Sequence, residues 1–109
     1  MTSADYLKAV MERHHVTSIY GAAKLIGTTN NTPTNWQLGK SMSDKHARKV
    51  AHLLDIPEAV VLMDVTAEKT KDENAKALYQ GMADALRDTP LEALPPALQD
   101  VVTGRLYIM

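Results

Sequence analysis

Residues 27–41, which read GTTNNTPTNWQLGKS, hold the side chains best suited to a chemical task. An asparagine side chain offers a donor and an acceptor together, so it can bind the major-groove edge of adenine through two hydrogen bonds. Three asparagines and two threonines lie close together in this segment: Asn30, Asn31, Asn35, Thr32 and Thr34. The same residue types are common in turns, and taken alone the segment would be a polar loop. The elements that flank it therefore decide between a binding helix and a loop.

Two helices are predicted before this segment. Apolar residues at helical spacing indicate a helix over residues 4–14, which Thr2 or Ser3 can cap. A second short helix follows Ser18, a suitable cap, and is closed by Gly27, because glycine readily adopts the left-handed conformation that ends many helices. The polar segment thus begins at a helix end.

Three more short helices are predicted from the polar segment onward. Thr29 is placed to cap the third helix and Gly39 to stop it, with Trp36 at a spacing typical of a core position. Ser43 caps a fourth helix whose apolar residues recur with a helical period, and Pro57 opens a fifth, since proline is tolerated at the first helical position. Five helices are therefore expected within about the first 65 residues.

The last third of the chain is predicted to be a helical extension. A polar, charged stretch over residues 66–72 is the expected boundary, and a sixth helix follows over 73–87. The apolar side of that helix is expected to hold Ala77, Leu78, Met82, Ala85 and Leu86. A short helix after the Pro-Pro break and an apolar tail over 106–109 complete the chain. A free apolar tail would favour association, so we expect it to be docked or to form an interface.

Composition bounds the function. The 109 residues, 45% of them apolar and 23% charged, are typical of one soluble domain, and the absence of cysteine excludes disulfides, thiolate zinc sites and a cysteine nucleophile. No signal peptide and no apolar run of about 20 residues is evident, so we expect a soluble, cytoplasmic protein.

The net charge of −1 hides an asymmetry between the two halves. Residues 1–54 hold seven Lys and Arg against three acids, whereas residues 55–109 hold five against ten. A basic front half and an acidic back half suit a module that faces DNA with the front half.

The residue pattern predicts neither a catalytic site nor a metal site. Four histidines are present, but none pairs with a carboxylate at a usual metal-ligand spacing: His14, His15, His46 and His52. The adjacent Asp72 and Glu73 lie in a solvated stretch, and no nucleophile, base and orienting group occur together. We therefore expect no catalytic residue, metal or cofactor.

Several weak signals in the right order give the chain a family resemblance. Residues 4–65 resemble the Cro and CI repressors of phages and the wider bacterial family of such regulators. The matching residues are Gly27 and Thr29 in the turn, Trp36 near the helix end, and the pair Gly39 and Lys40. Residues 50–64, reading VAHLLDIPEAVVLMD, also look like the family's continuation. The resemblance implies an all-α fold, with a five-helix lambda-repressor-like helix-turn-helix domain over residues 1–70 and a helical extension over 71–109.

The resemblance also implies which residues bind double-stranded DNA. It places base-reading side chains at Asn30, Asn31, Thr34 and Asn35. Phosphate ligands are expected at Thr29, Thr32, Lys40 and Ser41, and less strongly at Lys24 and Lys45.

Pro33 departs from the family pattern, in which a valine or isoleucine usually packs inward at this position. Proline lacks an amide and strains a helix from the fourth residue onward, so a helix that begins at Asn30 would be strained. If the helix instead begins at Thr32, Asn30 and Asn31 lie in the turn, and Thr34 and Asn35 keep their base contacts.

The expected function is that of a sequence-specific transcriptional regulator, a phage- or prophage-type repressor that binds a two-fold operator as a homodimer. Residues 71–109 are the candidate dimer element, with Leu78, Met82 and Leu86 as contacts, although these side chains can equally pack on their own domain. The alternative function is a protein-binding adaptor, antitoxin-like or host-factor-binding, on the same scaffold. Loss of DNA binding in an Asn35→Ala variant would separate the two.

Overall fold

The computed structural model describes residues 1–103, and within them every regular element is a helix. The elements in chain order are α1 (Ser3–Arg13), α2 (Ile19–Ile26), α3 (Asn31–Gln37), α4 (Asp44–Leu54), α5 (Glu58–Lys69), α6 (Glu73–Asp88), the 3-10 turn η1 (Leu91–Ala93) and α7 (Pro96–Thr103). The predicted all-α class is confirmed, and five helices do precede residue 70. The apolar tail at 106–109 lies outside the described residues.

Most helices begin at the residues that the sequence marks as caps. At α1, Thr2 Oγ1 accepts a hydrogen bond from the Asp5 amide at 3.2 Å, and Asp5 accepts one from the Thr2 amide at 2.9 Å. This capping box lowers the pKa of Asp5, chiefly through the bond from the Thr2 amide. Ser18 and Ser43 cap α2 and α4 in the same way, through the amides of the third helical residues. Local chemistry therefore sets these helix starts.

Helix α1 begins at Ser3, one residue before the predicted start, and two predicted assignments at the entrances of α3 and α5 are also wrong by one residue. Asn30, not Thr29, occupies the N-cap position of α3, and its side chain makes no capping hydrogen bond. Pro57 is the N-cap of α5 rather than its first helical residue, because its ψ of 138° keeps it extended. These errors are of one residue because threonine and asparagine are both suitable N-cap residues, and proline is tolerated at the start of a helix.

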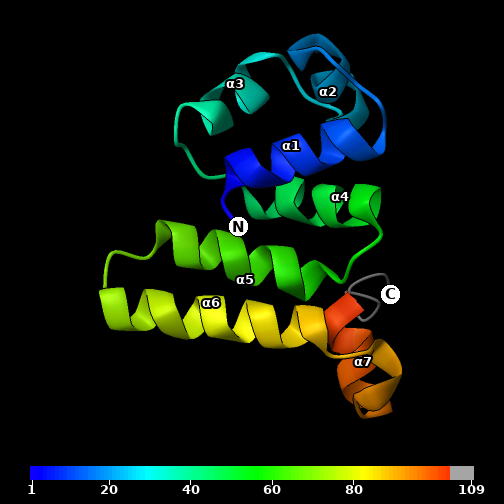
Figure 1. The fold of residues 1–109 in the computed structure, drawn as a ribbon, viewed down its shortest axis with the longest axis vertical. Coiled ribbons are helices and arrows are strands. Elements are labelled where there is room, and N and C mark those ends of the chain that lie inside the picture. The colour runs from blue at the N-terminus through cyan, green and yellow to red at the C-terminus, as the bar shows by residue number, and fades with distance from the viewer. Residues whose placement is uncertain (104–109) are drawn as a thin grey trace.

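The core lies where α1, α2, α3, α4 and α5 meet (Figure 1). Its buried members come from all five helices and, at Met42, from the segment between α3 and α4: Tyr6, Leu7, Val10, Ala22, Ile26, Trp36, Met42, Ala47, Val50, Ala51, Val61 and Val65. Of the four predicted core positions of α4, Ala47, Val50 and Ala51 are confirmed as buried, and Leu54 is half-buried. These side chains hold α2 and α3 on top of α1 and α4.

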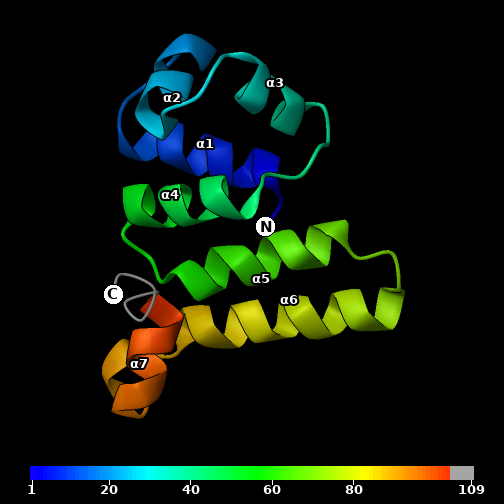
Figure 2. The same cartoon turned by 180° about the vertical axis from the view of Figure 1, so that it is seen from behind.

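Helices α5 and α6 lie side by side and antiparallel below the first four helices, with α7 at one end (Figures 1 and 2). The fully buried residue of α6 is Ala83. The sequence placed Ala77, Leu78, Met82, Ala85 and Leu86 on one apolar side, but only Leu86 is half-buried and the other four are exposed. Helix α6 therefore packs on α5 through a different face and leaves most of the predicted apolar side in solvent.

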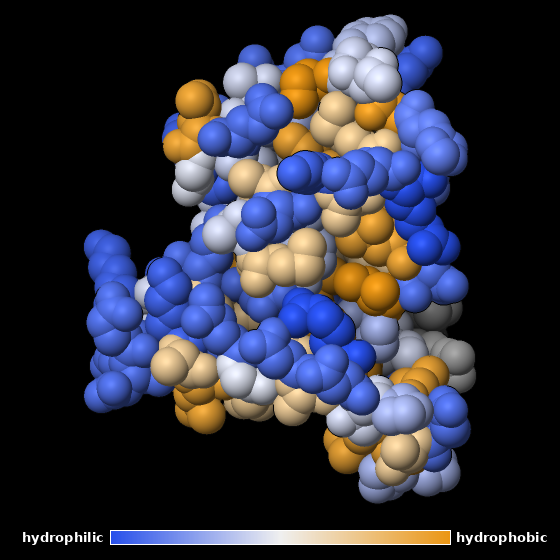
Figure 3. Space-filling model, viewed as in Figure 1, coloured by the Kyte–Doolittle hydropathy of each residue, from blue (hydrophilic) through white to orange (hydrophobic). Residues whose placement is uncertain are grey.

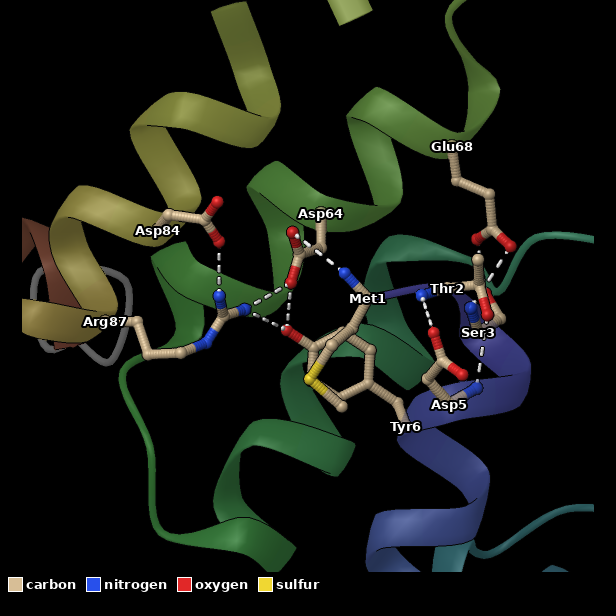
Figure 4. A network of polar contacts seen from close by, with 9 residues as sticks. All are labelled: Met1, Thr2, Ser3, Asp5, Tyr6, Asp64, Glu68, Asp84 and Arg87. Atoms are coloured by element: carbon tan, nitrogen blue, oxygen red, sulfur yellow. Dashed lines mark hydrogen bonds and ion pairs between the residues drawn. The ribbon is translucent and has the colours of Figure 1, made fainter. Parts of the chain in front are cut away.

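A buried polar network joins the chain's amino end, α1, α5 and α6 (Figure 4). The Asp64 side chain, 1% exposed, accepts a short hydrogen bond from the Tyr6 hydroxyl and another from Arg87 Nη2 at 2.6 Å. The Met1 amine lies 3.5 Å from the second Asp64 oxygen, and Arg87 Nη1 pairs with the exposed Asp84 at 2.6 Å. Burial and the neighbouring Asp64 raise the pKa of the Tyr6 phenol, so it stays a neutral donor. The network fixes α6 against the core.

Candidate nucleic-acid interface

The turn between α2 and α3 consists of residues 27–30 and is set by Gly27. This glycine has φ +85°, and both its amide and that of Thr28 donate to the Ala23 carbonyl at 2.9 Å. A left-handed residue at this point ends α2 and redirects the chain at once. Only the four residues 27–30 therefore separate α2 from α3.

Pro33 and Trp36 form the inner side of α3. Both are buried, and Trp36 is only 2% exposed. Helix α3 begins at Asn31, so Pro33 is its third residue, where a backbone amide has no helical partner to lose. The helix thus starts between the two predicted alternatives, and Pro33 fills the inward position without strain.

The His46 ring supports Trp36 from α4. The two ring centroids are 5.8 Å apart at an interplanar angle of 66°, an edge contact, and His46 Nδ1 lies 3.1 Å from the Ser43 hydroxyl. Burial and, second, the nearby Lys45 lower the pKa of His46. A neutral imidazole in this place packs its ring against the indole and links α4 to Trp36 of α3.

The C-terminal end of α3 is closed by a hydrogen-bond motif around Gly39. Gly39 has φ +98°, its amide donates to the Trp36 carbonyl at 3.1 Å, and the Lys40 amide donates to the Asn35 carbonyl at 3.0 Å. These two bonds form a Schellman motif, which requires a left-handed residue. Both ends of α3 are therefore fixed, and the predicted role of Gly39 as the stop is confirmed.

The outer side of α3 carries uncharged hydrogen-bonding groups. Asn30, Asn31 and Thr34 are exposed, and Asn35 is half-buried. Within residues 1–103 the three asparagine side chains make no hydrogen bond, so their amides face solvent with their donors and acceptors unused. The Thr34 hydroxyl donates to the Asn30 carbonyl at 2.8 Å and keeps its acceptor lone pairs. The four predicted base-reading residues thus lie together on or beside α3.

The predicted phosphate ligands are more scattered. Thr29, Lys24, Lys40 and Lys45 are exposed, Ser41 is half-buried, and the half-buried Thr32 hydroxyl accepts a bond from Thr28 at 2.9 Å. Thr32 is therefore partly committed within the turn. In the part of the chain that the structure describes, none of the three lysines is in an ion pair. The Lys24 ammonium instead lies 5.6 Å from the centre of the Tyr20 ring.

Three exposed side chains near α3 were missed from the sequence: Tyr20, Gln37 and Leu38. Tyr20 is 62% and Leu38 75% exposed. For Tyr20 the available signal was the helical period of α2, because the inward positions of that helix leave Tyr20 on the opposite side.

The predicted dimer contacts on α6 divide into two groups. Leu78 and Met82 are 62% and 43% exposed. Leu86 is half-buried and lines a groove of 570 Å³ together with Ile56 and Pro57 of its own chain. Apolar side chains gather along the lower edge of the molecule, beneath α6 and around α7 (Figure 3). Of the three predicted dimer contacts, Leu78 and Met82 are therefore exposed and Leu86 packs against its own chain.

The chain matches no family model, and neither a curated protein nor a solved structure matches it. Among the described residues, no helix is long and apolar enough to cross a bilayer, and no three potential metal ligands cluster. The geometry of α3 and its surroundings is therefore the basis for a functional proposal.

Proposed function

We propose that this chain is a sequence-specific regulator that binds double-stranded DNA through a lambda-repressor-like helix-turn-helix unit, with α3 in the major groove. One observation carries the proposal. Helix α3 is fixed from within by Pro33 and Trp36, while Asn30, Asn31 and Asn35 present side-chain amides that make no hydrogen bond within the described part of the chain. Exposed polar side chains on a fixed helix, with no hydrogen bond to the rest of the protein, are available to bind base edges in a DNA groove.

The chemistry of the outer side favours adenine. Asn31, at the first helical position, and Asn35, one turn later, point along one helix side and can each bind adenine N6 and N7. Thr34 lies between them and can accept or donate a further bond. Lys24, Lys40 and Lys45 are exposed and would hold phosphates, which sets register without reading sequence.

The regulator acts as a homodimer in this proposal. The exposed Leu78 and Met82 on α6 supply an apolar contact for a second copy. Two copies of α3 would then enter successive major grooves about 34 Å apart, and a bound dimer would occlude a promoter, as the Cro and CI repressors that the sequence resembles are expected to do.

The experiment that tests the proposal is binding-site selection from a pool of random duplexes, followed by titration against DNA upstream of the protein's own gene. We expect a selected two-fold site that Asn31→Ala weakens by about thirtyfold or more, the loss of one bidentate base contact in each half-site. The matched control is Asn74→Ala, which removes an exposed asparagine from the first turn of α6.

Salt dependence completes the test. Lys40→Ala is expected to weaken binding to all duplexes alike and to reduce the salt slope by about two, one phosphate contact for each subunit of the dimer. Weak binding without sequence preference, or equal effects of the Asn31 and Asn74 substitutions, would refute base reading and favour the protein-binding adaptor.

A further inference from the structure

Leu38 is the one apolar side chain on the outer side of α3. Helical spacing places Asn31, Thr34, Asn35 and Leu38 on one side, at positions i, i+3, i+4 and i+7. Leu38 continues the helical turn as the C-cap, with φ −85° and ψ 4°, and its amide donates to the Thr34 carbonyl at 3.1 Å. Its position is thus set by the same backbone as that of the asparagines.

The exposure of Leu38 is exceptional for this protein. At 75% it is the most exposed large apolar side chain among residues 1–103, although Pro33 and Trp36 on the other side of the same helix are buried. Scattered exposed leucines are ordinary, but this one completes a stripe of otherwise polar groups. The Gly39 motif directly after it holds it outward rather than against the core.

We propose that Leu38 contacts the C5-methyl group of a thymine, and that each operator half-site therefore combines an adenine read by asparagine with this thymine. The inference rests on the proposed function. The thymine methyl is the apolar feature of the major groove, and apolar side chains are its usual partners. A rise of about 1.5 Å per residue separates Asn31 from Leu38 by about 10 Å along the helix, or about three base-pair steps.

Replacement of thymine by deoxyuridine tests this contact, because it removes the methyl group and leaves the hydrogen-bonding edge unchanged. After a site has been selected from a synthetic, unmethylated pool, each thymine is replaced in turn, and the dissociation constants of wild type, Leu38→Ala and Leu98→Ala are measured by fluorescence anisotropy. Leu98 is a matched control because it is an exposed leucine on α7, which does not pack on α3.

We expect one thymine per half-site at which deoxyuridine weakens wild-type binding about fourfold, the value for one buried methylene-sized group. The same replacement should leave the affinity of Leu38→Ala unchanged and should weaken Leu98→Ala as it weakens wild type. A selected site with no such thymine, or with equal losses in wild type and Leu38→Ala, would overturn this inference alone. A pool that yields no preferred site would overturn the proposed function and this inference together.

Discussion

The Arg87–Asp64 pair gives a quantitative prediction about what holds α6 in place. Arg87→Met keeps the apolar stem of the side chain but removes the guanidinium that lies 2.6 Å from Asp64. The Asp64 carboxylate, 1% exposed, would retain only the Tyr6 hydroxyl and the Met1 amine at 3.5 Å. Loss of one partner from a fully buried pair costs about 3–5 kcal/mol. Because the Arg87 side chain is 34% exposed, solvent screening reduces the expected loss in unfolding free energy to about 2 kcal/mol.

The assay is urea unfolding followed by the fluorescence of Trp36, the single tryptophan, which is buried. Asp84→Asn is the control, because this partner of Arg87 is 66% exposed and its loss should change the unfolding free energy by less than about 0.5 kcal/mol. Adding Asp64→Asn to Arg87→Met should recover part of the stability, since it removes the unpaired buried charge. A double variant less stable than Arg87→Met, or an Arg87→Met variant as stable as wild type, would refute the reasoning.

Three further predictions concern α3, its support and α6. Gly39→Ala should lower the unfolding free energy by about 1–2 kcal/mol, because alanine is strained at φ +98°, and an unchanged urea midpoint would contradict the motif. Because burial lowers the pKa of His46 below its usual 6.5, the unfolded chain binds its proton more readily and stability falls as pH drops through about 6.5. His46→Gln should lose less stability than wild type between pH 7.5 and 5.5, and equal losses would exclude this histidine as the source. Leu78→Glu and Met82→Glu should shift the protein to monomers in sedimentation velocity, whereas Leu98→Glu should not, and three equal sedimentation profiles would place the contact elsewhere.

The sequence by itself determined the helices and their ends, because these depend on interactions within a few residues. Ser18 and Ser43 cap helices through the amides three residues on, and Gly27 and Gly39 end them in the left-handed conformation. The sequence left the start of α3 open, since Thr29 and Asn30 are both suitable N-cap residues. With Asn30 as the N-cap, Pro33 is the third residue of the helix.

The family resemblance implied the residues of the candidate site, and the helical period of α3 accounts for their outward position. An inward Trp36 requires Asn31 and Thr34 to lie outward, as they do. The exposure of Leu38 could not be predicted in the same way, because an apolar residue at a helix end is as often part of the core. Only packing shows that no neighbouring element covers it.

Tertiary structure alone decided the orientation of α6. This helix carries apolar residues around much of its surface, so its period allows more than one buried face. The choice is made by contacts far apart in sequence, where Arg87 pairs with Asp64 and Tyr6 and the small Ala83 meets α5. Burying an ionic pair requires both partners and the hydroxyl to meet in one place, a condition that no local pattern encodes. The face bearing Leu78 and Met82 is exposed as a consequence of that choice.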